Sequence, residues 1–377
     1  MGRASLIALV LAVMLGPPAA DAAVAPSQQI SSDPFTNAGA QHATEVEPDT
    51  FSFGDTVVAA FQVGRFRDGG ATTIGWATST DGGSSWTSGF LPSLTVFSAP
   101  AGRFSRVSDP AVAYDRAHGV WLISVLGWRD TGGIAPVSSL VVSRSPDGLR
   151  WSAPVTTAPE VGSFAHDKNW VVCDSGAASR FGGRCYTTWT DVTSAGALAV
   201  STSLDGGLTW GVPVVGRTGE ITGSQPVVRP DGVLVIPYLN DGGVAAVRST
   251  DGGVSLGTPV RVSRLAGSQP PGLRAPPLPS AEVDAGGRVY VAWPDCRFRP
   301  RCERPGRRPG NDMVLSSSAD GRTWTEPAAV PIGGSDQLLP GLGVDPTTQG
   351  TSARLALAYY ALTPAGCTAA ACRLGAG

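Results

Sequence analysis

Charged residues, histidines and long apolar runs are scarce in this 377-residue chain, and each scarcity excludes a class of protein. Lysine, arginine, aspartate and glutamate together make up 15% of the sequence, and the formal net charge is -2. A nearly neutral chain has no basic field that would attract nucleic acid. After the N-terminus, no segment reaches the roughly 18 consecutive apolar residues that a membrane helix requires. We therefore expect a soluble protein that binds neither nucleic acid nor a membrane.

The first residues are typical of a secretory signal peptide. Arg3 supplies a positive charge, residues 6–15 form an apolar run, and residues 20–22 read Ala-Asp-Ala, a pattern of small residues at a cleavage site. The run is too short to cross a bilayer. We predict that residues 1–22 are removed on export and that the mature protein is secreted. Residues 23–377 are expected to form a single domain and a monomer.

Cysteine is present six times, and in an exported chain this number favours disulfides. Six cysteines can pair in several ways, but their spacing favours three local bonds: Cys173 with Cys185, Cys296 with Cys302, and Cys367 with Cys372. Zinc is the competing interpretation. It is disfavoured because no two cysteines are separated by two residues and because the chain has 3 histidines. We expect no cofactor, and structural Ca²⁺ held by aspartates is the one metal left open.

Glycine and proline are abundant, with 49 and 31 residues, and short apolar segments lie between them. These segments are rich in β-branched and aromatic residues, and such runs bounded by turn residues indicate β-strands. Examples are residues 111–114 with 120–123, 227–228 with 233–236, and 281–283 with 289–293. The composition therefore predicts an all-β fold.

One short motif occurs five times along the chain, and its aspartates are roughly 45 to 70 residues apart. This spacing is typical of propellers and solenoids. Aspartate and serine side chains bond the backbone of a tight turn, glycine supplies a positive φ, and tryptophan packs the turn against a sheet. The copies are residues 79–86, 145–151, 203–210, 249–256 and 318–324.

Pairs of strands precede these motifs, so each repeat predicts a four-stranded antiparallel meander, which is one blade of a β-propeller. Six such blades are expected. The last one lacks the motif, so either residues near 27–42 complete it or it is incomplete. The expected blades are residues 44–100, 108–160, 166–220, 224–265, 278–332 and 337–377.

The motif Ser-x-Asp-x-Gly-x-x-Trp is the Asp-box, or bacterial neuraminidase repeat, and the chain resembles the sialidase superfamily. The segments SDPAVAYD and VYVAWPDCRFR between the motifs look most like secreted actinobacterial proteins with these repeats. Two copies of the motif are one residue short, and Leu256 replaces the tryptophan in another. The resemblance implies a six-bladed propeller with the motifs at its outer rim. It also implies an exo-acting glycoside hydrolase for terminal acidic sugars.

A sialidase-type site implies a tyrosine nucleophile, a glutamate that activates it, an aspartate acid/base and three arginines that hold the sugar carboxylate. Carried over residue by residue, the resemblance assigns Arg65 and Asp68 to the second strand of the first blade and the turn after it. It assigns Glu282 and Arg297 to the fifth blade. These four residues are the candidate catalytic set.

Two segments depart from the family pattern. Residues 45–48 read Glu-Val-Glu-Pro, without the leading arginine, and residues 337–342 contain neither arginine nor tyrosine. Tyr359 and Tyr360 come later, in a strand where a core position is expected. Two functions therefore remain open: a glycoside hydrolase, or a non-catalytic propeller that binds a polysaccharide or a protein.

Several second strands end in an aromatic residue next to a polar one, and several first strands begin with charged residues. In a propeller these positions converge on one face. Stacking of a sugar ring on tryptophan, with hydroxyl groups bonded to carboxylates, suits a glycan or glycoconjugate as partner. The glycan-binding candidates are Asp109, Trp128, Arg129, Asp167, Lys168, Trp189, Asp191, Trp293 and Asp295.

Overall fold

The computed structural model describes residues 27–132, 136–162, 165–266, 270, 272–302, 309–363 and 373–376. The predicted signal peptide and the cysteines Cys367 and Cys372 lie outside these residues. Within the described part, the chain is all-β apart from two short 3₁₀ turns, Val192–Ser194 and Gly350–Ser352. None of its described helices has the length and apolar character needed to cross a bilayer.

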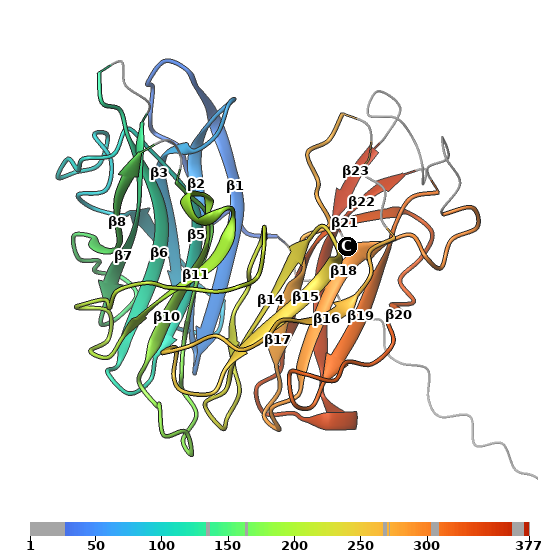
Figure 1. The fold of residues 1–377 in the computed structure, drawn as a ribbon. Coiled ribbons are helices and arrows are strands. Elements are labelled where there is room, and N and C mark those ends of the chain that lie inside the picture. The colour runs from blue at the N-terminus through green and yellow to red at the C-terminus, as the bar shows by residue number, and fades with distance from the viewer. Residues whose placement is uncertain are drawn as a thin grey trace, which may run out of the picture.

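The strands form consecutive antiparallel meanders, which we call units 1 to 6 (Figure 1). Units 1 and 2 are joined into an eight-stranded sheet by pairing of Ala71 with Val107. Unit 1 contains β1 (Ala40–Phe53), β2 (Thr56–Phe66), β3 (Ala71–Ser79) and β4 (Thr87–Phe90), and unit 2 contains β5 (Arg106–Asp115), β6 (Val120–Arg129), β7 (Val137–Ser145) and β8 (Val155–Gly162).

Units 3 to 5 are separate four-stranded sheets, and unit 6 is a three-stranded sheet. Unit 3 contains β9 (His166–Cys173), β10 (Cys185–Asp191), β11 (Ala197–Ser203) and β12 (Val214–Val215). Unit 4 contains β13 (Val227–Val228), β14 (Leu234–Asn240), β15 (Gly243–Ser249) and β16 (Val260–Ser263). Unit 5 contains β17 (Ser280–Val283), β18 (Val289–Asp295), β19 (Asp312–Ser318) and β20 (Ala328–Ala329), and unit 6 contains β21 (Asp336–Val344), β22 (Leu355–Thr363) and β23 (Arg373–Ala376).

Apolar side chains pack each unit against the next. Ile74 of unit 1 and Ile123 of unit 2 share one cluster, and Leu122 of unit 2 shares another with Val171 of unit 3. Similar clusters join unit 3 to unit 4, unit 4 to unit 5, and unit 5 to unit 6. Because both faces of the middle units are covered in this way, their strands are almost continuously buried.

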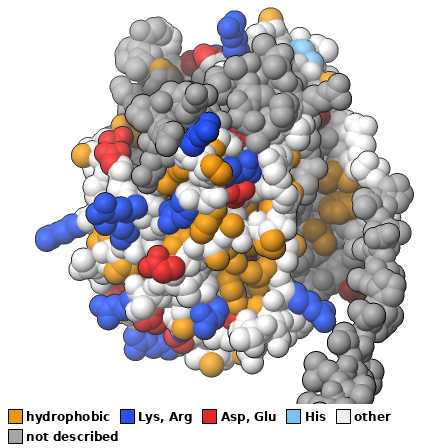
Figure 2. Space-filling model, turned by 90° about the vertical axis from the view of Figure 1, so that its right-hand side faces the viewer, with side chains coloured by type: hydrophobic (Ala, Val, Ile, Leu, Met, Phe, Trp, Pro, Cys, Tyr) orange, Lys and Arg blue, Asp and Glu red, His pale blue; other side chains and the backbone are white. Residues whose placement is uncertain are grey.

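Unit 6 differs from the middle units because some of its large apolar side chains are exposed. Residues 27–39 form no strand and do not complete unit 6, since Ile30 and Phe35 pack against unit 1 instead. Leu339 and Tyr360 of unit 6 are 39% and 43% exposed. Figure 2 shows the side of the molecule that lies on the right in Figure 1, where hydrophobic side chains gather between lysines and arginines.

Two of the predicted disulfides are confirmed. Cys173 of β9 is bonded to Cys185 of β10, which faces it in the ladder, and Cys296 is bonded to Cys302 in the loop after β18. Both bonds are local, as the spacing of the cysteines predicts.

The five repeated motifs form hydrogen-bonded turns. In the first, Asp81 Oδ1 accepts hydrogen bonds from the Ser79 hydroxyl and the Ser85 amide, and the Trp86 indole donates to the carbonyl of Gly83. In the fourth, Asp251 accepts from Ser249 and Ser255 in the same way, although Leu256 replaces the tryptophan. The turn is therefore built by the serine and aspartate, and the tryptophan is not needed for its hydrogen bonds.

The first strands of units 1 and 5, which are far apart in sequence, each carry one enclosed carboxyl group. Asp49 of β1 accepts a hydrogen bond of 2.7 Å from the amide of Val112, and burial raises its pKa to about 7. Burial, with repulsion from Asp49, raises the pKa of Glu282 of β17 to about 8. These carboxyl groups therefore favour the protonated form in the folded protein.

We predict that Glu282→Gln stabilises the protein at pH 8 but not at pH 5. The folded protein holds the Glu282 proton more tightly than the unfolded chain, so wild-type stability falls as pH rises from about 4.5 to about 8. The gain in free energy of unfolding at pH 8 should be on the order of 1–3 kcal/mol. Urea denaturation at both pH values measures it, with the exposed Glu326→Gln as control. Parallel pH profiles for Glu282→Gln and the wild type would contradict the prediction.

We predict that Asp251→Ala lowers the free energy of unfolding by about 2 kcal/mol, because it leaves a turn amide and a hydroxyl without their charged acceptor. Asp241→Ala, in the exposed turn between β14 and β15, is the matched control and should cost less than about 0.5 kcal/mol. Chemical denaturation of both variants measures the difference. Equal losses would show that the hydrogen bonds of the repeated turn do not contribute.

Candidate functional site

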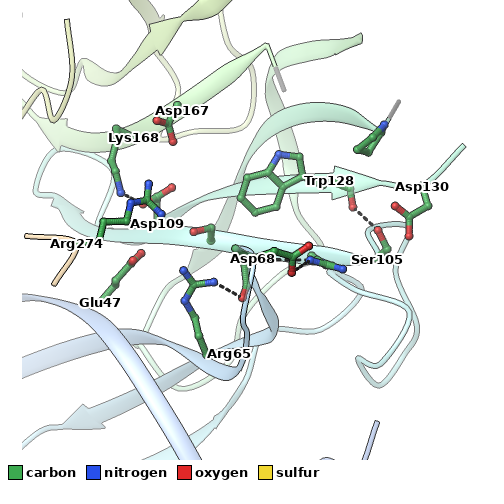
Figure 3. Close-up of a pocket in the computed structure, with 15 residues that line it drawn as sticks. Glu47, Arg65, Asp68, Ser105, Asp109, Trp128, Asp130, Asp167, Lys168 and Arg274 are labelled. Carbon is green, nitrogen blue, oxygen red and sulfur yellow. Dashed lines mark hydrogen bonds and ion pairs between the residues drawn. The ribbon is translucent and has the colours of Figure 1, made fainter. Parts of the chain in front are cut away.

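Units 1, 2 and 3 enclose a pocket of about 300 Å³ (Figure 3). Unit 1 contributes side chains from β1, β2 and the turn after β2, unit 2 from β5 and β6, and unit 3 from the start of β9. Arg274, from the segment between β16 and β17, completes the wall. The charged residues that line the pocket are Glu47, Arg65, Asp68, Arg106, Asp109, Asp130, Asp167, Lys168 and Arg274.

Three of these charged residues occupy the same position in their units. In β1, β5 and β9, two residues oppose a single residue of the second strand, which is the geometry of a β-bulge. The first bulge residue is Glu47, Asp109 or Lys168, with φ of 52°, 48° and 53°. These positive φ values are unusual for residues with a side chain. The shared geometry brings the three side chains into one pocket.

Lys168 lies at the centre of this charge cluster. Its ammonium group is 3.1 Å from Asp109 Oδ1, and both side chains are mostly buried. Attraction by Asp109, and further by Glu47 and Asp167, raises the pKa of Lys168. Lys168 therefore stays charged, is ion-paired with Asp109, and attracts Glu47 and Asp167 electrostatically.

Two carboxyl groups of the cluster favour the protonated form more than usual. Although Glu47 as a residue is exposed, its carboxyl group is enclosed, and this burial, with the adjacent Asp109 carboxylate, raises its pKa. The Gln62 amide donates a hydrogen bond to Glu47 Oε2. Burial and Asp109 likewise raise the pKa of Asp167. These two carboxyl groups therefore hold a proton more readily than an exposed carboxyl group does.

Asp68 has the opposite electrostatic environment. The Arg106 guanidinium donates a hydrogen bond of 2.6 Å to Asp68, and this contact lowers the pKa of the exposed carboxyl group. Arg106 also lies 4.3 Å above the Phe66 ring. Arg65 is held by the carbonyls of Phe66 and Gly70. Arg65 and Asp68 thus line the pocket as expected, but Asp68 is poorly suited to donate a proton.

The aromatic wall of the pocket is Trp128, at the end of β6 (Figure 3). Its carbonyl accepts hydrogen bonds from the amide and hydroxyl of Ser105. Gly70, with a φ of 74°, packs so closely that a Cβ there would come within 2.9 Å of the indole. A glycine is therefore required at this position for the indole to keep its place.

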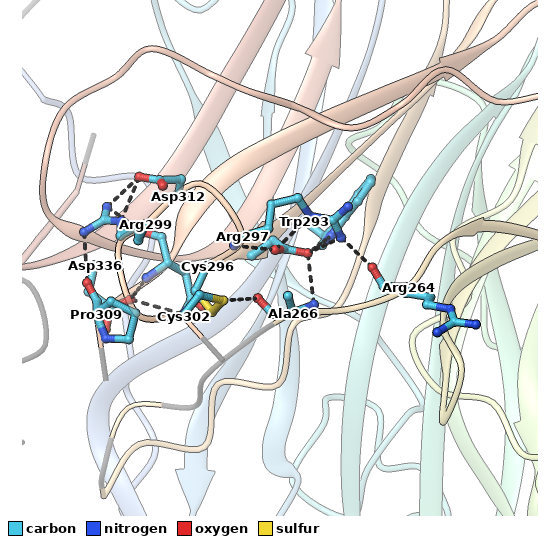
Figure 4. Close-up of a disulfide and its surroundings, with 12 residues drawn as sticks. Arg264, Ala266, Trp293, Cys296, Arg297, Arg299, Cys302, Pro309, Asp312 and Asp336 are labelled. Atoms are coloured by element: carbon cyan, nitrogen blue, oxygen red, sulfur yellow. Dashed lines mark hydrogen bonds and ion pairs between the residues drawn. A yellow bond between two sulfur atoms is a disulfide. The ribbon is translucent and has the colours of Figure 1, made fainter. Parts of the chain in front are cut away.

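The other two candidate catalytic residues lie elsewhere. Glu282 lies near Asp49 and not among the residues that line the pocket. Arg297 forms an ion pair of 2.7 Å with Asp295 and bonds the Ser263 hydroxyl, so it fixes the loop that contains the Cys296–Cys302 bond (Figure 4). The four residues expected to act together are thus not gathered in one pocket.

Five of the glycan-binding candidates also lie outside this pocket. Trp189 and Trp293 are 1% and 0% exposed and belong to the apolar clusters between units, which corrects their expected role as platforms. Asp295 is fully buried and accepts hydrogen bonds from the Trp293 indole and from Arg297. Asp191 caps a 3₁₀ turn, and Arg129 is paired with Glu160 at 2.6 Å.

Sequence reasoning missed four charged residues of the pocket. Glu47 lies in the segment where the family pattern has an arginine, and Arg106 is the first residue of β5, the strand that contains Asp109. Asp130 directly follows the candidate Arg129. Arg274 lies in a proline-rich segment far away in sequence. The signal that could have found Glu47 is the proline that follows it, because Asp109 and Leu339 also precede a proline at a bulge.

One group of possible metal ligands comes together among the described residues, namely Asp115, Cys173 and Cys185. The two cysteines are bonded to each other, so they offer no thiolate to a metal. Asp115 accepts a hydrogen bond of 2.6 Å from His118. These residues therefore do not fit a metal site.

No protein-family model and no curated protein sequence matches the chain. Solved structures do match. A Hadza microbial sialidase has a TM-score of 0.54 and 19% identity, over 89% of this chain and 66% of that one. The intramolecular trans-sialidase of Ruminococcus gnavus, in complex with oseltamivir carboxylate, matches with a TM-score of 0.55 and 14% identity, over 85% of this chain and 90% of that one. Trypanosoma rangeli sialidase in complex with sialic acid matches with a TM-score of 0.56 and 14% identity, over 90% of this chain and 56% of that one.

The chain spans slightly less than two thirds of the Hadza sialidase and just over half of the trypanosomal one. At these identities, structural similarity is evidence about the fold and leaves the chemistry open. The chain has the fold of the sialidases.

Proposed function

We propose that this chain is a secreted six-bladed propeller that binds a glycan through one terminal, acidic sugar in the pocket between units 1, 2 and 3. Each of the six units would be one blade, with the last blade incomplete, and residues 23–377 would form the single domain. The observation that carries the proposal is the pocket itself, which combines an aromatic wall with charged side chains of both signs.

The size and lining of the pocket suit a sugar. A volume of about 300 Å³ lies at the small end of ligand sites. Trp128 offers an apolar ring on which the C–H face of a sugar could stack, and Asp109, Asp130 and Asp167 offer acceptors for hydroxyl groups. The site would hold one ring and leave the rest of the glycan outside.

The cationic side chains support an acidic sugar. Arg65, Arg106 and Arg274 reach the pocket from three different segments, and guanidinium groups bind carboxylates well. Solved structures with this fold hold sialic acid and oseltamivir carboxylate. A sialidase mechanism of the usual kind is not supported, because Glu282 and Arg297 do not line the pocket.

We predict that Trp128→Ala weakens sugar binding by about tenfold or more, because the stacking surface is lost. Trp128→Phe should retain most of the affinity. The measurement is isothermal titration calorimetry with sialic acid, glucuronic acid and 3′-sialyllactose, and Phe298→Ala, a half-exposed aromatic in the Cys296–Cys302 loop, is the control.

Binding that is equal in the wild type and Trp128→Ala would place the sugar elsewhere. If the folded wild type binds none of the three sugars, the proposal of an acidic sugar is wrong. A glycan array would then separate a neutral glycan from a protein partner.

A further inference from the structure

Arg106 of β5 is the direct partner of Trp128 of β6 in the antiparallel ladder, and both residues line the pocket. Side chains of directly opposed residues lie next to each other on one face of a sheet. The turn after β2 confirms that the two are neighbours, since a Cβ at Gly70 would lie 2.9 Å from the Trp128 ring and 3.2 Å from Arg106 Cβ. A sugar ring stacked on Trp128 would therefore have the Arg106 side chain beside it.

The guanidinium group of Arg106 is fixed in place but only partly bonded. Its Nη1 donates hydrogen bonds to Asp68 Oδ1 at 2.6 Å and to the Gly69 carbonyl at 3.3 Å. In the described part of the chain, its Nη2 and Nε have no hydrogen-bond acceptor. The guanidinium carbon lies 4.3 Å from the centre of the Phe66 ring, and the side chain is 34% exposed. Arg106 can therefore offer two parallel N–H groups to a carboxylate.

The present anionic partner of Arg106 is one that a ligand could replace. The Asp68 side chain is 76% exposed, and one of its oxygens bonds one nitrogen of Arg106. A carboxylate bound through two parallel hydrogen bonds is held more strongly than one bound through a single hydrogen bond. We propose that Arg106 selects the acidic group of the ligand and that Asp68 competes for the same guanidinium group until the ligand binds, an inference that rests on the proposed function.

The other cations of the pocket are less suited to this role. Arg65 is held by two backbone carbonyls of its own turn. Lys168 is paired with Asp109 at 3.1 Å, and both side chains are mostly buried. Arg274 is exposed and comes from the segment between β16 and β17. Arg106 combines a fixed position beside the stacking wall with an exposed partner that can leave, and the Asp68 charge repels anions that cannot reach the guanidinium group.

A comparison of each acidic sugar with its methyl ester tests Arg106 as the selecting residue. We predict that Arg106→Gln weakens binding of sialic acid or glucuronic acid by about tenfold or more, because the partner of the carboxylate is lost. Binding of the uncharged methyl ester of the same sugar should change by about twofold or less. Arg106→Lys keeps the charge without the two parallel N–H groups, so it should retain part of the preference for the acid. Isothermal titration calorimetry measures all four ligands.

Removal of the Asp68 charge should have the opposite effect. We predict that Asp68→Asn strengthens binding of the acids by about three- to tenfold, because a competing and repelling carboxylate is gone, and leaves binding of the esters unchanged. The gain should be absent when Asp68→Asn is combined with Arg106→Gln, since the two residues act through one contact. Asp55→Asn is the matched control: it removes the same charge from an exposed position at the other end of β2.

The outcomes separate this inference from the proposed function. If the wild type binds the acids and the preference over the esters is unchanged in folded Arg106→Gln, or is lost in Arg274→Gln instead, the role of Arg106 is overturned and the proposed function stands. A gain from Asp68→Asn that persists without Arg106, or that Asp55→Asn equals, overturns the competition. If the folded wild type binds no acidic sugar, the proposed function fails, and the inference fails with it.

Discussion

The packing of each sheet against the next is the constraint on which the rest of this structure depends. A single four-stranded sheet exposes two apolar faces, and here the clusters around Ile74 and Ile123, or Leu122 and Val171, bury them between consecutive units. Units that stack in this order align their first strands side by side. The side chains at equivalent points of β1, β5 and β9 are therefore brought together although they are far apart in sequence.

The bulges convert this alignment into a site. A regular strand would direct successive side chains to its two faces, where they would pack against the neighbouring units. The extra residue in each first strand, with its positive φ, instead places Glu47, Asp109 and Lys168 in the pocket. The same bulge in β21 carries Leu339, which has no charge to contribute. Among the strands β1, β5, β9 and β21, only those of the first three units carry a charged side chain at the first bulge residue.

The sequence predicts the architecture well because its signals are local. A serine, an aspartate and glycines make a turn without help from other units, and the cysteines pair within their own hairpin or loop. The site is harder to predict. Trp128 and Trp189 both end a second strand, yet one lines a pocket and the other is covered by neighbouring units. Arg274 reaches the pocket from a segment that only the packing of distant units brings near.

A crystal structure with bound sialic acid tests the central claim most directly, because it locates the ligand without assuming any chemistry. The account predicts that the sugar ring lies against Trp128, with its carboxylate toward the arginines and its hydroxyl groups toward Asp109 and Asp167. A sugar bound away from this pocket, with the pocket accessible to solvent in the crystal, would contradict the account. The bulge positions of units 1 to 3 would then have a structural role only.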